Sequence, residues 1–179
     1  SVIVLQNSET GRPVALLDGN WVTAVRTAAL SVVAARRMAN PESRVIALIG
    51  CGLQARSHLN AMARTFPLVE VRAFGRGKPN IDALKELADS LGLGLHAAST
   101  PEEAMRGADL IVSSLTRMPG SKPFIDAAAV EPGAFASLVD LARPWLPSSL
   151  EKFDKIIIDD TVQEATMKDQ MVPRGLVSG

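Results

Sequence analysis

Residues 45–55, which read VIALIGCGLQA, decide the fold of this chain. An uninterrupted apolar run such as residues 45–49 is typical of a strand buried on both faces of a parallel sheet. Gly50 then permits a tight turn, Gly52 lets the backbone approach a pyrophosphate, and the small Ala55 lets the next helix pack closely on the strand. The N-terminus of that helix attracts anions. The motif therefore predicts a dinucleotide site, and glycines that only make the turn are the alternative.

Strands and helices alternate outward from this motif. Apolar residues at helical spacing predict helices over residues 53–66 and 81–91, and the hydroxyls, proline and acids of residues 99–103 predict the start of another. Short apolar runs predict strands at residues 45–49, 69–74, 93–98, 110–115, 134–139 and 155–158. This alternation is typical of a doubly wound, mostly parallel α/β sheet, the Rossmann-like fold of NAD(P)-binding domains.

An arm precedes the first of these strands. Residues 1–19 predict a β-hairpin, because two apolar runs flank the turn-forming residues 7–11. A helix follows from Val22 to Arg37, with cations in its last turn, and the Asn-Pro pair at residues 40–41 ends it. We therefore divide the chain into a hairpin-and-helix arm at residues 1–40 and an α/β domain at residues 41–179.

The composition excludes several classes of partner. Nineteen Lys and Arg residues are balanced by 19 Asp and Glu, so the chain lacks the positive field that attracts nucleic acid or an anionic membrane. No apolar run reaches the about 18 residues that a membrane span needs. We expect no nucleic-acid partner, no membrane partner, and a reduced, cytoplasmic environment.

The cysteine and histidine content excludes two further kinds of site. With one cysteine and two histidines in 179 residues, neither a disulfide framework nor a Cys/His zinc cluster can form, and we expect no metal. Cys51 is either reactive at a helix N-terminus or a small residue tolerated between two glycines. His58 and His96 lack metal-ligand spacing, so we expect them to be structural or surface residues.

The end of the second predicted strand bears on the choice of cofactor. An NAD site places Asp or Glu there, about 20 residues after the glycines, to bind the ribose 2′-hydroxyl. This chain instead reads AFGRGK over residues 73–78, with Arg76 and Lys78 but no acid. Two cations suit a 2′-phosphate, so NADP(H) is favoured over NAD(H). A solvated basic turn beside an NAD site is the alternative.

Other candidates follow from the rule that ligands of open α/β sheets lie at the carboxyl ends of the strands. Those ends carry residues 113–116, 139–140 and 159–160. Asp140 would either face a nicotinamide and a substrate or cap the next turn. Arg26 lies on the partly apolar side of its helix, so it either forms an internal salt bridge or binds an anionic ligand.

Three motifs, in this order and spacing, resemble the ornithine cyclodeaminase/mu-crystallin family: GRPVALLDG at residues 11–19, TAVRTAA at 23–29 and IGCGLQA at 49–55. EPGA at residues 131–134 and IIDD at 157–160 are also similar to family signatures. The resemblance implies an NAD(P)-dependent enzyme that acts on an amino acid or a cyclic imino acid. Members include cyclodeaminases, alanine dehydrogenases and ketimine or cyclic-imine reductases.

The resemblance also implies roles for individual residues. Arg26 would bind the substrate carboxylate, Thr27 would approach the cofactor phosphate, and Arg76 would bind the 2′-phosphate. The remaining implied cofactor residues are the pyrophosphate loop, Gly50, Cys51, Gly52, Leu53 and Gln54, and the nicotinamide side, Ser114, Leu115, Thr116 and Val139.

The chain departs from the family pattern at residues 139–145. Family members commonly carry Gly-Ala-Asp-x-Pro-Gly-Lys, with a catalytic aspartate, where this chain reads VDLARPW. If Pro144 matches the family proline, Ala142 takes the place of the aspartate and Asp140 lies two residues earlier. We predict that Asp140 serves as the catalytic carboxylate instead.

The second departure is length, since family members have further segments that form a substrate-binding and dimerisation domain. We expect residues 1–40 to belong to that domain, the full-length protein to be a homodimer, and these 179 residues alone to bind dinucleotide with little turnover. The alternative function is a non-catalytic dinucleotide-binding or sensor module of mu-crystallin type.

Overall fold

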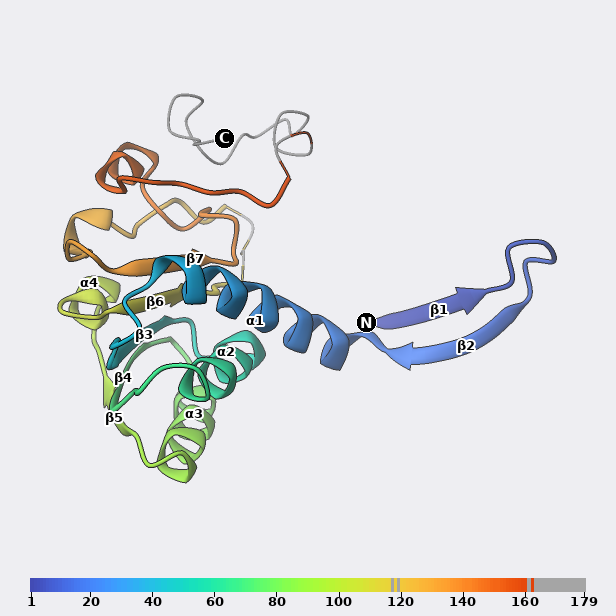
Figure 1. Ribbon diagram of the computed structural model, residues 1–179, viewed down its shortest axis with the longest axis horizontal. Helices are drawn as coiled ribbons and strands as arrows, with labels where there is room; N and C mark the ends of the chain where they lie inside the picture. The colour runs from blue at the N-terminus through green and yellow to red at the C-terminus, as the bar shows by residue number, and fades with distance from the viewer. Residues whose placement is uncertain (117, 119, 161, 163–179) are drawn as a thin grey trace.

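The computed structural model describes residues 1–116, 118, 120–160 and 162 (Figure 1). Strands in the order β5–β4–β3–β6–β7 form one parallel sheet. Their bounds are β3 Val45–Ile49, β4 Glu70–Phe74, β5 Gly94–Ala97, β6 Leu110–Ser113 and β7 Phe135–Leu138. The helices that alternate with them are α2 (Leu53–Ala63), α3 (Lys78–Ser90) and α4 (Pro101–Met105). The predicted doubly wound α/β fold is confirmed.

The strand order reverses at β3, and this reversal positions the site. From β3 the chain steps outward through β4 to β5, and it then crosses back to place β6 on the other side of β3. Ile49, the last residue of β3, is in register with Phe74 of β4 and with Ser113 of β6. Connections that leave neighbouring strands in opposite directions open a crevice above their carboxyl ends. A ligand of this sheet is therefore expected above the end of β3.

Two apolar cores enclose the sheet, because successive side chains of a strand point to opposite faces. Ile46 and Leu48 of β3 belong to the first core, which the helices on that face complete with Ala35, Ala55, Leu59, Met62 and Leu84. Ala47 and Ile49 belong to the second core, which also contains Met105, Ile111, Trp145 and Leu150. The central strand is thus buried on both faces, as its uninterrupted apolar sequence predicts.

The N-terminal arm is a hairpin followed by a long helix. Strands β1 (Val2–Gln6) and β2 (Pro13–Asp18) pair antiparallel and project away from the sheet (Figure 1). The Asp18 side chain caps α1 (Gly19–Met38) by accepting a hydrogen bond from the Asn20 amide at 2.9 Å. The buried residues of α1 are all small: Gly19, Ala24, Ala28, Ser31 and Ala35. The predicted hairpin and helix are both confirmed.

The chain after β7 differs from the prediction. Residues 155–158 form no strand of the sheet; Ile156 instead packs against the second core, while Lys155 and Ile157 are exposed. Ile156 takes part in an isolated bridge, so this short apolar run buries a side chain without forming a strand, and periodicity alone does not separate the two cases. Asp159 and Asp160 therefore do not lie at the end of a sheet strand. The last part of the predicted domain, from residue 163, is outside the described residues.

The helices in the connections on this face are short. The 3-10 helices η1 (Ala127–Ala129) and η2 (Pro147–Lys152) lie against each other there. Within the described ranges, no helix combines the length and the apolar character needed to cross a membrane.

A buried polar network joins three elements of the first face. His58 of α2 is fully buried, and its Nδ1 lies 2.7 Å from the Gln54 carbonyl oxygen. Because a carbonyl oxygen only accepts, Nδ1 carries the proton and Nε2 of the neutral ring accepts from the Ser31 hydroxyl of α1 at 2.9 Å. The Ser31 oxygen lies 2.8 Å from the Ser137 hydroxyl of β7. His58 is therefore a structural residue, which is one of the two roles, structural or surface, that the sequence predicts for it.

This network predicts a pH dependence of stability. Burial lowers the pKa of His58 below its ordinary value near 6.5. The unfolded chain then binds a proton that the folded chain resists, so the free energy of unfolding falls as pH drops below about 6.5, with a slope of up to about 1.4 kcal/mol per pH unit. Urea denaturation between about pH 7 and about pH 5 should show this slope in the wild type and lose it in His58→Gln.

The exposed His96 provides the matched control. His96→Gln removes the other histidine, whose side chain is 56% exposed and lies 3.3 Å from Glu103 Oε1, and it should leave most of the slope in place. A slope that persists in His58→Gln, or that disappears in His96→Gln, would contradict the assignment.

Candidate functional site

The turn between β3 and α2 requires its first glycine. Gly50 has φ +99°, a conformation that L side chains rarely adopt, and its amide donates to the Phe74 carbonyl at 2.7 Å. A Cβ at this position would lie 3.0 Å from the Ser114 carbonyl oxygen. The turn therefore brings the start of α2 against the end of β6, and only glycine accommodates both the conformation and the close approach.

The second glycine is different, because nothing in the protein requires it. Gly52 caps α2 with φ −79° and ψ −161°, an extended conformation open to any residue. A Cβ built on Gly52 would meet no atom within 4 Å. The space that a side chain would fill lies open at the N-terminus of α2, where backbone N–H groups and the helix dipole favour an anion. This vacancy fits the approach of a pyrophosphate.

The neighbouring Cys51 is a packing residue. Its side chain is buried, and burial raises the pKa of the thiol, which opposes thiolate formation. A Cβ at Gly75 would lie 2.7 Å from the Cys51 sulfur, so the thiol fills the space beside the next loop. Of the two sequence interpretations, the small residue between glycines agrees with the structure. Ala55 is fully buried against the sheet, as its proposed packing role requires.

Buried polar atoms without a partner gather at this edge. Within the described part of the chain, the buried side-chain nitrogen and oxygen atoms that lack a hydrogen bond are Gln54 Oε1, Ser114 Oγ and Asp140 Oδ1. Buried polar groups are nearly always hydrogen-bonded, and leaving one unpaired costs about 1–3 kcal/mol. All three belong to residues that the sequence marks as site residues. Their unused capacity indicates a polar ligand.

Asp140 has one oxygen held and one free. Its Oδ2 accepts from the Ser113 hydroxyl at 2.5 Å and from the Leu115 amide at 3.1 Å. Burial nevertheless raises the pKa of Asp140, because the loss of hydration outweighs these two bonds and the further lowering by the backbone of Asp140 and Ala142. The carboxyl group therefore keeps its proton to a higher pH than an exposed aspartate does. A carboxyl group of this kind is suited to give or take a proton.

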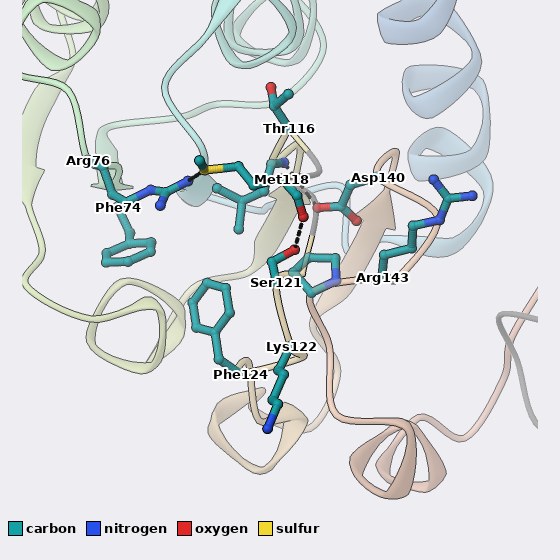
Figure 2. A pocket seen from close by; sticks show the side chains of 11 residues that line it. Phe74, Arg76, Thr116, Met118, Ser121, Lys122, Phe124, Asp140 and Arg143 are labelled. Carbon is teal, nitrogen blue, oxygen red and sulfur yellow. Dashed lines mark hydrogen bonds between the residues drawn. The ribbon is translucent and has the colours of Figure 1, made fainter.

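A pocket of about 410 Å³ opens beside Asp140 (Figure 2). Phe74 and Phe124 form part of its apolar wall, with ring centroids 6.5 Å apart, and the charged residues on its rim are Arg76, Lys122 and Arg143. Leu115, Thr116, Met118, Ser121 and Pro144 also line it. Figure 2 shows the Asp140 side chain between Arg143 and the loop that carries Met118. Three cations and one carboxylate make the pocket suitable for an anionic ligand.

The two cations after β4 have different environments. Lys78 forms an ion pair with Asp82 one helical turn later, at 2.8 Å. Arg76 is exposed at the pocket, where its Nη2 donates to the Met118 sulfur at 3.1 Å. No acidic residue stands between Phe74 and Lys78. Arg76 is therefore the cation available to a ligand at this loop.

The α1 candidates lie apart from the pocket. Arg26 is exposed, and in the ranges that the structure describes it forms no ion pair, so the internal salt bridge is not observed. Thr27 is half-buried, and its carbonyl oxygen lies 3.2 Å from the Ser31 hydroxyl oxygen. Neither residue lines the described pocket. Val139, at the end of β7, is half-buried and donates its amide to the Ser113 carbonyl at 3.0 Å.

Sequence reasoning missed several residues of this edge. Leu141 and Ala142, directly after Asp140, have φ of 63° and 54°, a left-handed pair outside glycine that costs about 1–2 kcal/mol per residue. The pocket residues of the loop before η1, Lys122 and Phe124, belong to no motif. Trp145 was not predicted as a site residue either, because its indole reaches Ser113 only once that turn has formed. No motif or compositional pattern in the sequence points to these residues.

The comparisons with known proteins decide the family. The profile of the ornithine cyclodeaminase/mu-crystallin family matches residues 1–145. The chain belongs to this family. The expected resemblance is thereby confirmed.

Several relatives of this ornithine cyclodeaminase/mu-crystallin chain carry names of enzymes. Ketimine reductase mu-crystallin of Rattus norvegicus is 31% identical over 168 residues, which cover 93% of this chain and 52% of the relative. Alanine dehydrogenase of Archaeoglobus fulgidus is 33% identical over 167 residues, covering 91% and 50% respectively. The chain thus spans about half the length of the curated relatives that it matches.

Solved structures agree on the fold. A lysine cyclodeaminase, solved to explain recognition of L-lysine, L-ornithine and L-2,4-diaminobutyric acid, matches with a TM-score of 0.82 and 26% identity over 99% of this chain and 52% of its own. An archaeal alanine dehydrogenase dimer with bound NAD matches with a TM-score of 0.73 and 30% identity over 90% and 50%. The nicotinamide cofactor is present in the second of these neighbours.

The same substitution, glycine to alanine, should have different effects at the two glycines of the turn. Gly50→Ala should lower the free energy of unfolding by at least about 1–2 kcal/mol, because it combines a left-handed φ with the approach to Ser114. Gly52→Ala should leave unfolding within about 0.5 kcal/mol of the wild type yet weaken dinucleotide binding at least about tenfold, because its methyl group fills the open space. Urea denaturation and cofactor titration of both variants measure the two effects. A Gly52→Ala variant with undiminished binding would remove the pyrophosphate from this position.

Proposed function

We propose that this chain forms the cofactor-binding part of an NAD(P)-dependent enzyme that acts on a small amino acid or cyclic imino acid. Hydride would pass between nicotinamide C4 and the carbon that bears the amine or imine. The observation that carries the proposal is that the buried oxygens of Gln54, Ser114 and Asp140, which lack a partner in the described ranges, belong to residues that follow the carboxyl ends of β3, β6 and β7. The enzymatic names of the family relatives support the reaction class.

The glycine turn and the start of α2 would hold the cofactor. Residues 50–54 would receive the pyrophosphate at the open space beside Gly52, and Thr27 of α1 would approach a phosphate from the other side. The residues that would line the nicotinamide side are Ser114, Leu115, Thr116 and Val139. A bound nicotinamide supplies or accepts the hydride, while these residues orient its ring and exclude water.

NADP(H) is the cofactor that we propose in preference to NAD(H). The loop after β4 offers the guanidinium of Arg76, which donates to the Met118 sulfur and forms no ion pair in the described ranges, and it lacks the acid that would bind a ribose 2′-hydroxyl. A guanidinium forms charge-assisted hydrogen bonds with a phosphate, and only NADP(H) has a phosphate at this position.

Cofactor titration tests this preference. Arg76→Ala should weaken NADP(H) binding by roughly ten- to a hundredfold, the effect of losing about 1.5–3 kcal/mol of charged hydrogen bonding, and should change NAD(H) binding little. Lys78→Ala is the matched control, because the Lys78 ammonium pairs with Asp82. Equal losses for both cofactors in Arg76→Ala would rule out a 2′-phosphate role.

The substrate would be held by one cation and served by one carboxyl group. Arg26, exposed on α1 and free of an ion pair in the described ranges, would bind the substrate carboxylate. Asp140, with its free oxygen and its raised pKa, would transfer the proton of the ammonium or of a water. The arm that carries Arg26 would belong to the substrate-binding part of the protein.

Residues 1–40 would contribute that part and a homodimer contact. An isolated two-stranded hairpin is marginally stable in water. In β1, β2 and the first turn of α1, large apolar side chains are exposed, among them Val14, Leu16 and Trp21. A second subunit or a neighbouring substrate domain would cover them. We propose the domain boundary near residue 40 on this ground, with the end of α1 packed on the α/β domain through Ala35.

Turnover assays in the full-length protein test the proposed function. Asp140→Asn keeps the size of the side chain but removes the acid, so kcat should fall by about 10²–10⁴ with NADPH and a panel of cyclic imines. Asp126→Asn, which replaces a carboxylate that caps η1, should retain normal turnover. Near-normal rates for Asp140→Asn would reduce Asp140 to a turn cap, whereas absence of turnover in the wild type with every imine of the panel would favour a dinucleotide-binding module without catalysis.

A further inference from the structure

A buried hydrogen-bonded chain leads from the second core to Asp140. The indole Nε1 of Trp145 donates to the Ser113 hydroxyl oxygen at 3.1 Å, and that hydroxyl donates to Asp140 Oδ2 at 2.5 Å. Trp145 is 1% exposed and Ser113 is fully buried. An indole N–H can only donate, so the direction of the chain is fixed: tryptophan to serine to carboxylate.

This hydrogen-bonded chain reaches only one oxygen of Asp140. Oδ2 receives the Ser113 hydroxyl and, in addition, the Leu115 amide, whereas Oδ1 is buried with no hydrogen-bond partner among the residues that the structure describes. Two donors on one carboxylate oxygen fix the rotation of the group. The other oxygen then keeps a defined direction at the pocket, whose charged rim residues are Arg76, Lys122 and Arg143.

The backbone after Asp140 places the tryptophan under the serine. Leu141 and Ala142 both have left-handed φ, and the Trp145 amide donates to the Ala142 carbonyl at 3.0 Å. Trp145 also forms a parallel bridge with Ile125, and the Leu146 amide donates to Ile125 at 2.8 Å. A left-handed pair outside glycine persists where the surroundings impose it, and such outliers cluster at functional sites. Here the turn brings the Trp145 indole back to Ser113, which is hydrogen-bonded to Asp140.

We propose that Ser113 and Trp145 are positioning residues that hold Asp140 through Oδ2 and direct Oδ1 toward the reacting group of the substrate. The proposal rests on the proposed function in giving Asp140 the proton transfer. A purely structural role would require only that the indole N–H and the serine hydroxyl be paired. The positioning role requires in addition that these two groups control the ionisation of Asp140.

Carbon-13 NMR of the aspartate carboxyl groups in the 179-residue chain measures this control directly. Asp140→Asn identifies the Asp140 resonance. Ser113→Ala removes the donor to the ionised carboxylate, so the titration midpoint of Asp140 should move to higher pH. Trp145→Phe keeps a ring in the core but removes the N–H, and it should move the midpoint in the same direction by a smaller amount.

Ser149→Ala is the matched control. Ser149 is a buried serine on the same face of the sheet, bonded to the Ala127 amide at 3.0 Å and the Leu146 carbonyl at 2.8 Å, away from Asp140. Its loss should lower the thermal midpoint as Ser113→Ala does while leaving the Asp140 titration unchanged. Equal shifts in Ser149→Ala and Ser113→Ala would overturn the proposal.

An unchanged Asp140 midpoint in folded Ser113→Ala would also overturn it. If that variant does not fold, Trp145→Phe decides, and an unchanged midpoint there is the contradicting result. The NMR measurement needs no turnover, so its failure is distinct from failure of the proposed function. If Asp140→Asn retains full kcat although the midpoints shift as expected, Ser113 and Trp145 still control the ionisation of Asp140, but Asp140 is not the catalytic carboxyl group.

Discussion

The close approach of the Gly50 turn to the end of β6 is the constraint on which the site depends. The left-handed φ of Gly50 directs the chain from β3 into α2, and a Cβ there would lie 3.0 Å from the Ser114 carbonyl. Without this contact, the N-terminus of α2 could not stand over the crevice between β3 and β6. Ser114, Leu115 and, through the Leu115 amide, Asp140 are held against the same turn.

The edge that results combines two different demands. Burial holds polar atoms in defined positions, but burial without hydrogen-bond partners is costly. The buried oxygens of Gln54, Ser114 and Asp140 have no such partner in the described ranges. A dinucleotide and its substrate would supply the missing partners. Burial also raises the pKa of Asp140, which makes the same constraint useful for proton transfer.

The sequence predicted what short segments determine. The apolar run of β3, the turn at Gly50 and the small Ala55 specify a strand, a turn and a close helix contact within eleven residues of sequence, 45–55, and the alternating elements followed. Residues 155–158 were wrongly predicted as a strand, because pairing depends on a neighbour that lies far away in the sequence. Likewise Trp145 and Ser113, 32 residues apart, meet only after the left-handed turn at Leu141 and Ala142 is formed.

The most direct test of the account is amide NMR of the isotope-labelled chain during titration with NADP⁺. Saturable shifts should be strongest at residues 50–54 and 113–116, with Arg76 and Asp140 also affected, and they should be small in the hairpin of β1 and β2. Absence of saturable shifts, or shifts confined to the hairpin and α1, would contradict the claim that the carboxyl edge of the sheet is a dinucleotide site.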